Sequence, residues 1–250
     1  MLRISVGRGR AVLTVRDHNV EDYAALRDMD ATDVAVLDGA DRACLDELGQ
    51  YLVSTDACQR FGIWLLHKHF EPAAGEVFVE GVVTAPRGTV TTPFSRSACS
   101  AQGLSPTSMR FDSNVSAGVG VIGMEFADAA EFGSTSPVST DDEAVLIGIA
   151  QRLRARGKTE RFGVRLIRDP LGLLDNEVLL ETCDIAHRAL CCSVAERHSV
   201  HAENSVETTW QWKPSLSRSG RRPIQKCMQM CSQDPYGNHY ISGHVYTGIR

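Results

Sequence analysis

The sequence matches itself when it is shifted by 101 residues, and this match constrains the fold more than any other feature. The segment RFGIWLLHKHFEPAAGEVFVE, which begins at Arg60, aligns without a gap with RFGVRLIRDPLGLLDNEVLLE. Identities extend in both directions, from the pair Asp41 and Asp142 to the pair Thr107 and Thr208. A repeat of this length predicts two similar structural units. The alternative is two helix-and-hairpin units of separate origin, which explains the shared Arg-Phe-Gly triplet less well.

Each copy predicts a helix, a hairpin of two strands, an irregular segment and a third strand. The helices are expected over residues 40–55 and 141–157, where leucines recur at helical spacing. Short apolar runs rich in β-branched residues predict the strands. These runs are 61–70, 76–80 and 107–112 in the first copy and 162–170, 177–181 and 208–213 in the second.

The fold class expected from this pattern is α+β. The internally duplicated helix–hairpin–strand unit would form two copies packed as a pseudo-twofold body, followed by a C-terminal tail that contains Cys and His. Residues 1–40 would form an N-terminal extension, 41–135 the first copy, 136–214 the second copy and 215–250 the tail.

Charge and composition limit the classes of partner. The net charge of −5 argues against a nucleic-acid partner. The N-terminus lacks the apolar core of a signal peptide, and no apolar run approaches the length of a membrane span. We therefore expect a cytoplasmic protein that binds a small molecule and no membrane. In that compartment the eight irregularly spaced cysteines favour free thiols or metal ligands over disulfides.

A pair of histidines marks the first candidate site. His67 and His69 end the first hairpin strand of copy one, and alternation places both on one face. Two imidazoles at this spacing can bind one transition metal, zinc or iron, if a further ligand comes from elsewhere. The alternative is two partly exposed histidines at the end of a strand.

The C-terminal tail supplies the second candidate site. Cys227, Cys231, His239 and His244 follow the spacing C-x3-C-x7-H-x4-H and offer the ligands that zinc prefers. The central gap is shorter than in a common zinc finger, and packing of the tail on the body is the alternative. A hybrid site, in which tail residues complete the histidine pair, is also open.

Two charged residues are candidates for a catalytic role. Arg168 aligns with His67 and would bind an anionic group, and Glu76 would act in acid–base chemistry. Residues retained in both copies are interpreted chiefly as scaffold, since glutamates can pair with arginines across a sheet. This set comprises Glu76 and Glu177, Glu80 and Glu181, and Arg60 and Arg161.

Three further patterns are weaker. If helical, Cys183, His187 and Cys191 would share one face as ligands or as a nucleophile pair, although buried cysteines also act as small apolar residues. The motif G-x-G-x-x-G from 118 to 123 is interpreted as a close-packed glycine strand. Trp210 and Trp212 are expected in the core or in a pocket wall.

Together these patterns favour a metal-binding protein, and within that class a metal-dependent enzyme acting on a small organic molecule in a cleft between the two halves. The alternative is a non-enzymatic binding or regulatory module in which the tail forms a structural zinc clip.

Overall fold

The computed structural model describes residues 13–16, 20–29, 32–96, 103–112, 119–128, 136–168, 170–200, 205–217 and 220–232. Two helices longer than five residues occur in this part, α3 (Gly39–Ser54) and α5 (Glu143–Ala155). Short helices are α1 (Val20–Ala24), α2 (Thr32–Ala35), η1 (Ala57–Gln59), η3 (Thr140–Asp142) and η4 (Arg197–Ser199). The strands are β1 (Leu13–Arg16), β2 (Phe61–Leu65), β3 (Glu76–Thr84), β4 (Arg87–Ser95), β5 (Leu104–Asp112), β6 (Val119–Asp128), β7 (Phe162–Leu166), β8 (Glu177–Asp184), β9 (Ala189–Glu196), β10 (Ser205–Ser217) and β11 (Gly220–Ser232).

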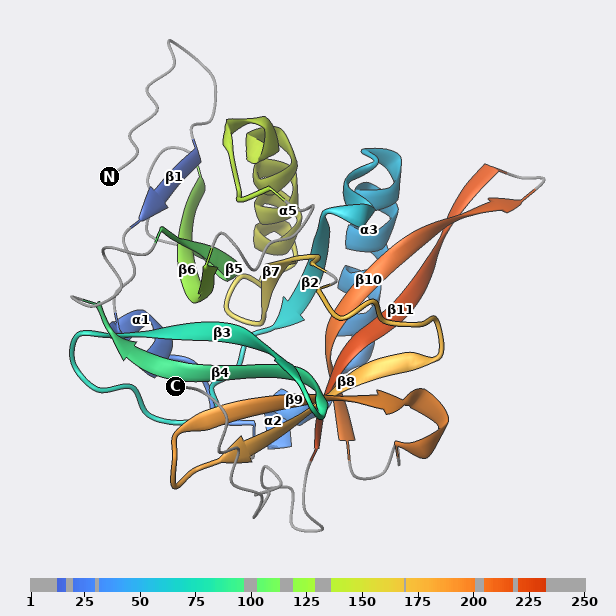
Figure 1. Cartoon of the computed structure of the whole chain (residues 1–250). Coiled ribbons are helices and arrows are strands. Elements are labelled where there is room, and N and C mark those ends of the chain that lie inside the picture. Colours follow the sequence, from blue (N-terminus) through green and yellow to red (C-terminus); the bar gives the residue numbers. More distant parts are fainter. Residues whose placement is uncertain are drawn as a thin grey trace.

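Ten of these strands close into a mixed β-barrel (Figure 1). The order around the ring is β6-β3-β4-β9-β8-β11-β10-β2-β7-β5, and β5 pairs again with β6 to close it. β1 adds to β6 outside the ring. The pairs β3–β6 and β8–β11 are parallel, and the other ring pairs are antiparallel. Closure removes the exposed sheet edges that invite aggregation.

The two long helices lie side by side against one side of the barrel (Figure 1). They cover the outer faces of β2 and β7, where Ile63, Leu65 and Val164 join the main apolar core. The helices approach closely because Gly148 faces the ring of Tyr51, leaving no room for a side chain. Likewise Gly49 of α3 packs against the indole of Trp212.

The opposite face of each strand points into the barrel. Trp64 alternates with Ile63 and packs inside with Phe78, Ile122 and Cys183. Charged side chains also lie in this interior, and they form the candidate sites described below. The two tryptophans of β10, expected in the core or in a pocket wall, are buried in the core under the helices.

The predicted α+β body of two packed copies is wrong. Strands from residues 41–135 and 136–214 intermix around one barrel, since β4 pairs with β9 and β2 pairs with β7. The two predicted helices are present, and strands recur at the spacing of 101 residues, but they do not build two bodies. The duplication itself and the four segment boundaries stay predictions.

The fold class was predicted wrongly because two strands of the ring, β4 and β11, form where no strand was expected. Irregular structure is expected after the first hairpin strands, yet β4 forms there in spite of Pro93. Its pairing with β9 covers only Gly88 to Thr91, so the missing N–H of the proline interrupts no bond there. Residues 220–232, predicted to be tail, form β11 in the ring between β8 and β10.

At the N-terminal end of each long helix, an ion pair joins residues 41–135 to residues 136–214. Arg60 binds Asp142 just before α5. Arg161 reciprocates by binding Asp41 in the first turn of α3, at 3.2 Å. Asp41 and Asp142 also close capping boxes at these ends, where a negative charge complements the helix dipole.

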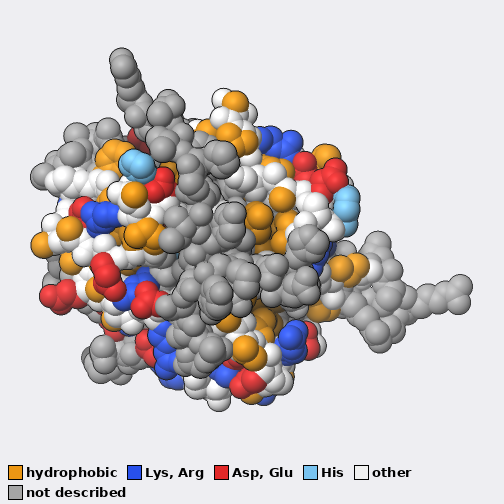
Figure 2. Space-filling model, turned by 90° about the horizontal axis from the view of Figure 1, so that it is seen from below, with side chains coloured by type: hydrophobic (Ala, Val, Ile, Leu, Met, Phe, Trp, Pro, Cys, Tyr) orange, Lys and Arg blue, Asp and Glu red, His pale blue; other side chains and the backbone are white. Residues whose placement is uncertain are grey.

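The described surface carries mixed charge. On the face in Figure 2, basic and acidic side chains lie interspersed. Exposed ion pairs such as Lys213 with Asp175, at 2.6 Å, are part of this pattern. Among the described residues, no helix combines the length and apolar character needed to cross a membrane.

Candidate metal centre

The histidine pair lies just beyond the end of β2, inside the barrel. The chain stays extended there, because the backbone N–H of Lys68 donates to the Arg27 carbonyl oxygen at 2.9 Å. Alternation then points His67 and His69 to one side and Lys68 to the other, where it binds Glu71. Both histidine side chains are almost fully buried, with 0% and 2% exposed.

Two strands bring the other members of the site. β8 and β11 run parallel, and their register sets Glu181 beside Cys231. The Thr208 hydroxyl donates to Glu181 Oε1 at 2.9 Å, which turns Oε2 toward the histidines. Glu181 and Cys231 are 1% and 0% exposed. Three stretches far apart in the sequence therefore meet at one buried point.

These donor atoms lie close enough together that the group could hold one metal ion. One ligand atom from each of His67, His69, Glu181 and Cys231 lies within 4.8 Å of the others. The Nε2 atoms of His67 and His69 lie 3.5 Å and 3.8 Å from Glu181 Oε2. Ligands about 2.1 Å from a tetrahedral ion are separated by roughly 3.4 Å. This buried group could hold a metal.

Neighbouring groups orient both imidazole rings. His67 Nδ1 lies 2.7 Å from the carbonyl oxygen of Leu65, which can only accept, so Nδ1 carries a proton and Nε2 points toward Glu181. His69 Nδ1 contacts the Cys183 sulfur at 3.3 Å. Such contacts to the second ring nitrogen fix the orientation of histidine ligands in metal sites.

Burial sets the protonation of the thiol. Desolvation raises the pKa of Cys231 well above its usual range, and the charge of Glu181 raises it further. The thiol is therefore neutral until a cation binds, and a bound metal would favour the thiolate.

Glu80 aligns with Glu181 in the sequence, and its partners in the barrel differ from those of Glu181. Glu80 and Glu181 are 101 residues apart, as are His67 and Arg168. Arg168 donates to Glu80 Oε1 at 2.8 Å, and Arg165 donates to Oε2 at 2.7 Å. One buried glutamate thus faces guanidinium groups, and the other faces imidazoles.

A pocket adjoins the metal centre. Its lining includes Leu179 and Gln229, which precede Glu181 and Cys231 by two residues on the same strands. Residues two apart on a strand share a face and lie about 6.6 Å apart. Gln229 accepts from Thr209 at 3.2 Å, and its Nε2 lies 3.3 Å from the Cys192 sulfur.

The other predicted metal ligands do not join this group within the described residues. Cys227 packs with Val178 and Met230 in a separate cluster, and its thiol donates to the Gln229 carbonyl oxygen at 3.2 Å. The register with β10 shifts between Gln229 and Cys227, and this bulge separates Cys227 from the face of Cys231. His239 and His244 lie outside the described residues.

The two predicted catalytic residues lie in different places. Arg168 lines the pocket. Glu76 starts β3 and binds Arg188 through contacts of 2.8 Å and 2.5 Å. That hydrogen bonding lowers the pKa of Glu76. Glu76 is not among the residues lining the pocket.

The sequence interpretation did not include Glu181 among the metal ligands. In the sequence, Glu181 resembles a structural residue, because the first copy retains a glutamate, Glu80, at the aligned position. The residues that face these two glutamates differ, since Arg168 faces Glu80 and His67 faces Glu181, and this difference between the copies was a usable signal. The condition that Cys183 and Cys191 share a helix is not met, since these residues lie in β8 and β9. The chain turns between them, and Arg188 has a positive φ of 51°.

No protein-family model, curated protein or solved structure matches this chain.

Proposed function

We propose that the chain binds one transition metal ion, zinc or iron, through His67, His69, Glu181 and Cys231. The observation that carries the proposal is the convergence of four buried donors from three separate stretches of the chain within 4.8 Å. Imidazole, thiolate and carboxylate groups together suit zinc, and imidazole and carboxylate also suit iron.

Charge balance inside the barrel supports the proposal. Glu80 and Glu125 each accept a bond from Arg165, at 2.7 Å in both cases. Glu181 instead faces two imidazoles, which are neutral when they act as ligands. A divalent cation would supply at Glu181 the positive charge that guanidinium groups supply at Glu80.

We further propose that the protein is a metal-dependent enzyme acting on a small organic molecule. The pocket next to the metal centre supports this, since it is lined by residues of both segments, Arg168 among them. A metal bound here would act as a Lewis acid or activate water. The chain's own part is to orient the imidazoles through Leu65 and Cys183 and to keep the site buried.

Metal analysis of the untagged chain tests the first proposal. We expect about one equivalent of zinc or iron per chain, and its loss in Glu181→Gln and His67→Ala. His198→Ala is the matched control, because that imidazole is 76% exposed. Less than about a tenth of an equivalent in the wild type, with no gain after reconstitution, would reject the metal site.

The second candidate function is a binding module with a structural metal. Four buried protein donors would complete a four-coordinate shell, which is typical of structural zinc sites. The two candidates differ in what chelation does. Loss of the cooperative unfolding transition on metal removal favours the structural role. A folded, metal-free barrel that regains turnover on reloading favours the enzyme.

A further inference from the structure

A short helix near the N-terminus contributes a buried side chain next to the metal centre. α1 presents Tyr23, which is 1% exposed and belongs to the interior cluster that contains Trp64 and Cys183 (Figure 1). The ring of Tyr23 packs on the ring of Phe78 in β3, with the ring centroids 4.2 Å apart. A tyrosine has two side-chain torsions, so a packed ring fixes the position of its hydroxyl group.

The hydroxyl group of Tyr23 binds the backbone of a metal-centre residue. Its oxygen accepts a hydrogen bond from the backbone N–H of His69. The imidazole of His69 is held separately, since its Nδ1 contacts the Cys183 sulfur at 3.3 Å. His69 is therefore fixed at its backbone and at its ring, and Tyr23 supplies the backbone contact.

The chain that follows Tyr23 binds the neighbouring residue, Lys68. The backbone N–H of Lys68 donates to the Arg27 carbonyl oxygen at 2.9 Å, and its ammonium group donates to the Ala24 carbonyl oxygen at 3.3 Å. β2 ends at Leu65, so these contacts hold the histidine loop beyond the end of the sheet. Residues 20–28 thus bind two consecutive residues of that loop.

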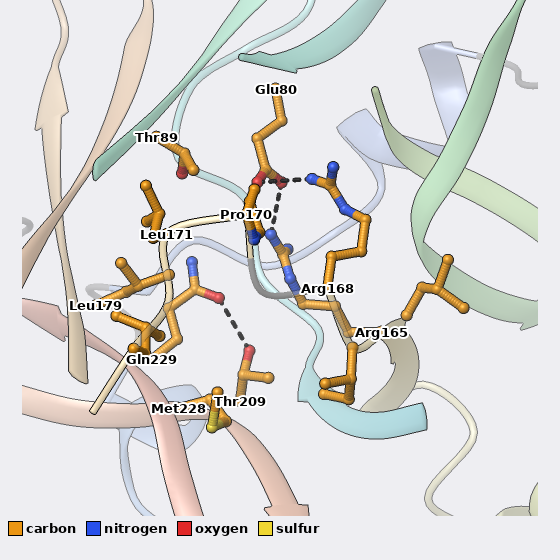
Figure 3. Close-up of a pocket in the computed structure, with 13 residues that line it drawn as sticks. Glu80, Thr89, Arg165, Arg168, Pro170, Leu171, Leu179, Thr209, Met228 and Gln229 are labelled. Carbon is orange, nitrogen blue, oxygen red and sulfur yellow. Dashed lines mark hydrogen bonds and ion pairs between the residues drawn. The ribbon is translucent and has the colours of Figure 1, made fainter. Parts of the chain in front are cut away.

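The aligned position in the other segment cannot make the contact that Tyr23 makes. Pro170 aligns with His69, and proline has no backbone N–H to donate. Pro170 lies instead in the wall of the pocket, where Arg168 donates to Glu80 (Figure 3). The hydrogen bond to Tyr23 is therefore particular to the histidine loop and is not a repeated feature of the barrel.

We propose that Tyr23 is a positioning residue for the metal centre, which fixes the backbone of His69 so that its imidazole is presented in the geometry that the metal requires. The proposal rests on the metal-binding function proposed above. Ligand groups that are held in place before the metal arrives lose less conformational freedom on binding, so their affinity for the metal is higher. Residues 20–28, expected to belong to an N-terminal extension, would then contribute to the metal centre.

Tyr23→Phe in the full chain tests the proposal, because it removes the hydroxyl group and keeps the packed ring. Cobalt(II) is the probe, and competition with a chromogenic chelator measures its affinity. We expect the affinity to fall by about 10- to 100-fold, the usual effect of losing a contact that orients a ligand. The visible ligand-field bands should change while the cobalt–thiolate band remains, because the donors stay the same and their geometry changes.

Tyr51→Phe is the matched control. The hydroxyl group of Tyr51 donates to the Ala144 carbonyl oxygen at 3.2 Å between the two long helices, so this variant also removes a bond between a tyrosine and the backbone. We expect its cobalt(II) affinity to stay within about twofold of the wild type, since the site is distant. Urea denaturation of both variants shows whether they lose similar stability, and an equal loss of cobalt(II) affinity in both would overturn the proposal.

A second measurement decides the matter if Tyr23→Phe does not fold. In the wild type, the His69 amide should exchange its hydrogen at least about a hundredfold more slowly than an unstructured peptide, because its bond to Tyr23 must open first. Exchange at the unstructured rate would overturn the proposal. Absence of metal from the wild type would reject the metal centre itself, whereas unchanged cobalt(II) affinity and bands in Tyr23→Phe would reject only the role of Tyr23.

Discussion

His67 Nε2 lies 3.5 Å from Glu181 Oε2 inside the barrel, and the other ring nitrogen of His67 is held by the Leu65 carbonyl oxygen. Two side chains from distant parts of the chain therefore face each other in a buried place. They are two of the four donors that could hold a metal ion.

Cys231→Ser should change the spectrum of the cobalt-substituted protein. A thiolate bound to cobalt(II) gives a charge-transfer band in the near ultraviolet, and serine removes the sulfur while retaining a small polar side chain. Cys227→Ser is the control, because Cys227 lies in a separate cluster on the same strand. A band that survives Cys231→Ser but disappears in Cys227→Ser would reverse the assignment.

Cys183→Ala should weaken metal binding without removing the cobalt–thiolate band. The Cys183 sulfur contacts His69 Nδ1 at 3.3 Å and so positions the ring, but it is not one of the four donors that could hold the metal. Loss of such an outer contact usually lowers affinity by about 10- to 100-fold. Competition with a chromogenic chelator measures the change. Loss of the band itself would make Cys183 a direct ligand instead.

Acid should abolish the stabilising effect of Arg188. Its hydrogen bonds lower the pKa of Glu76 in the folded state. The stabilisation from this pair is therefore fully present above the pKa of glutamate in the unfolded state, about 4.3, and is lost as the pH falls through the lowered pKa of the folded state. We expect Arg188→Gln to unfold at lower urea than the wild type at pH 7. The two should converge once the pH lies below both values. A constant difference across this range would contradict the assignment.

Gly49→Ala should destabilise the helix layer. A Cβ at this position would lie 2.2 Å from the Trp212 indole nitrogen, a contact that a buried ring cannot relieve cheaply. Overpacking of this kind costs about 1–3 kcal/mol. Gly81→Ala serves as the comparison, since a Cβ at Gly81 would meet no atom within 4 Å. Urea denaturation of both variants gives the two free energies of unfolding, and equal losses would contradict the close contact with Trp212.

Local signals predicted the local parts of this fold. The helix patterns predicted α3 and α5, and the short apolar runs predicted the first strands, because spacing and caps act within a few residues. The closed ring depends on pairs such as β4 with β9, which join residues about a hundred positions apart. No local pattern specifies such a pairing, so the barrel was not predicted.

The candidate site was predicted only in part, because residue type reveals some of its members and strand register decides the others. The histidine pair and Cys231 stand out by residue type, and their combination matches the hybrid site that the spacing left open. Glu181 does not stand out, because retention in both segments resembles a structural role. Its chemistry depends on which groups face it across the barrel, and only the strand register decides that.

The reciprocal bonds of Arg60 with Asp142 and of Arg161 with Asp41 have a consequence for synthesis on the ribosome. The N-terminal end of each long helix is bound by a residue from the other segment, and the ring lacks β11 until residue 232 has emerged. The first hundred residues therefore cannot reach their final arrangement while the rest is being made. Folding of this chain is expected to be late and slow for its length, because strands far apart in the sequence must pair to close the ring.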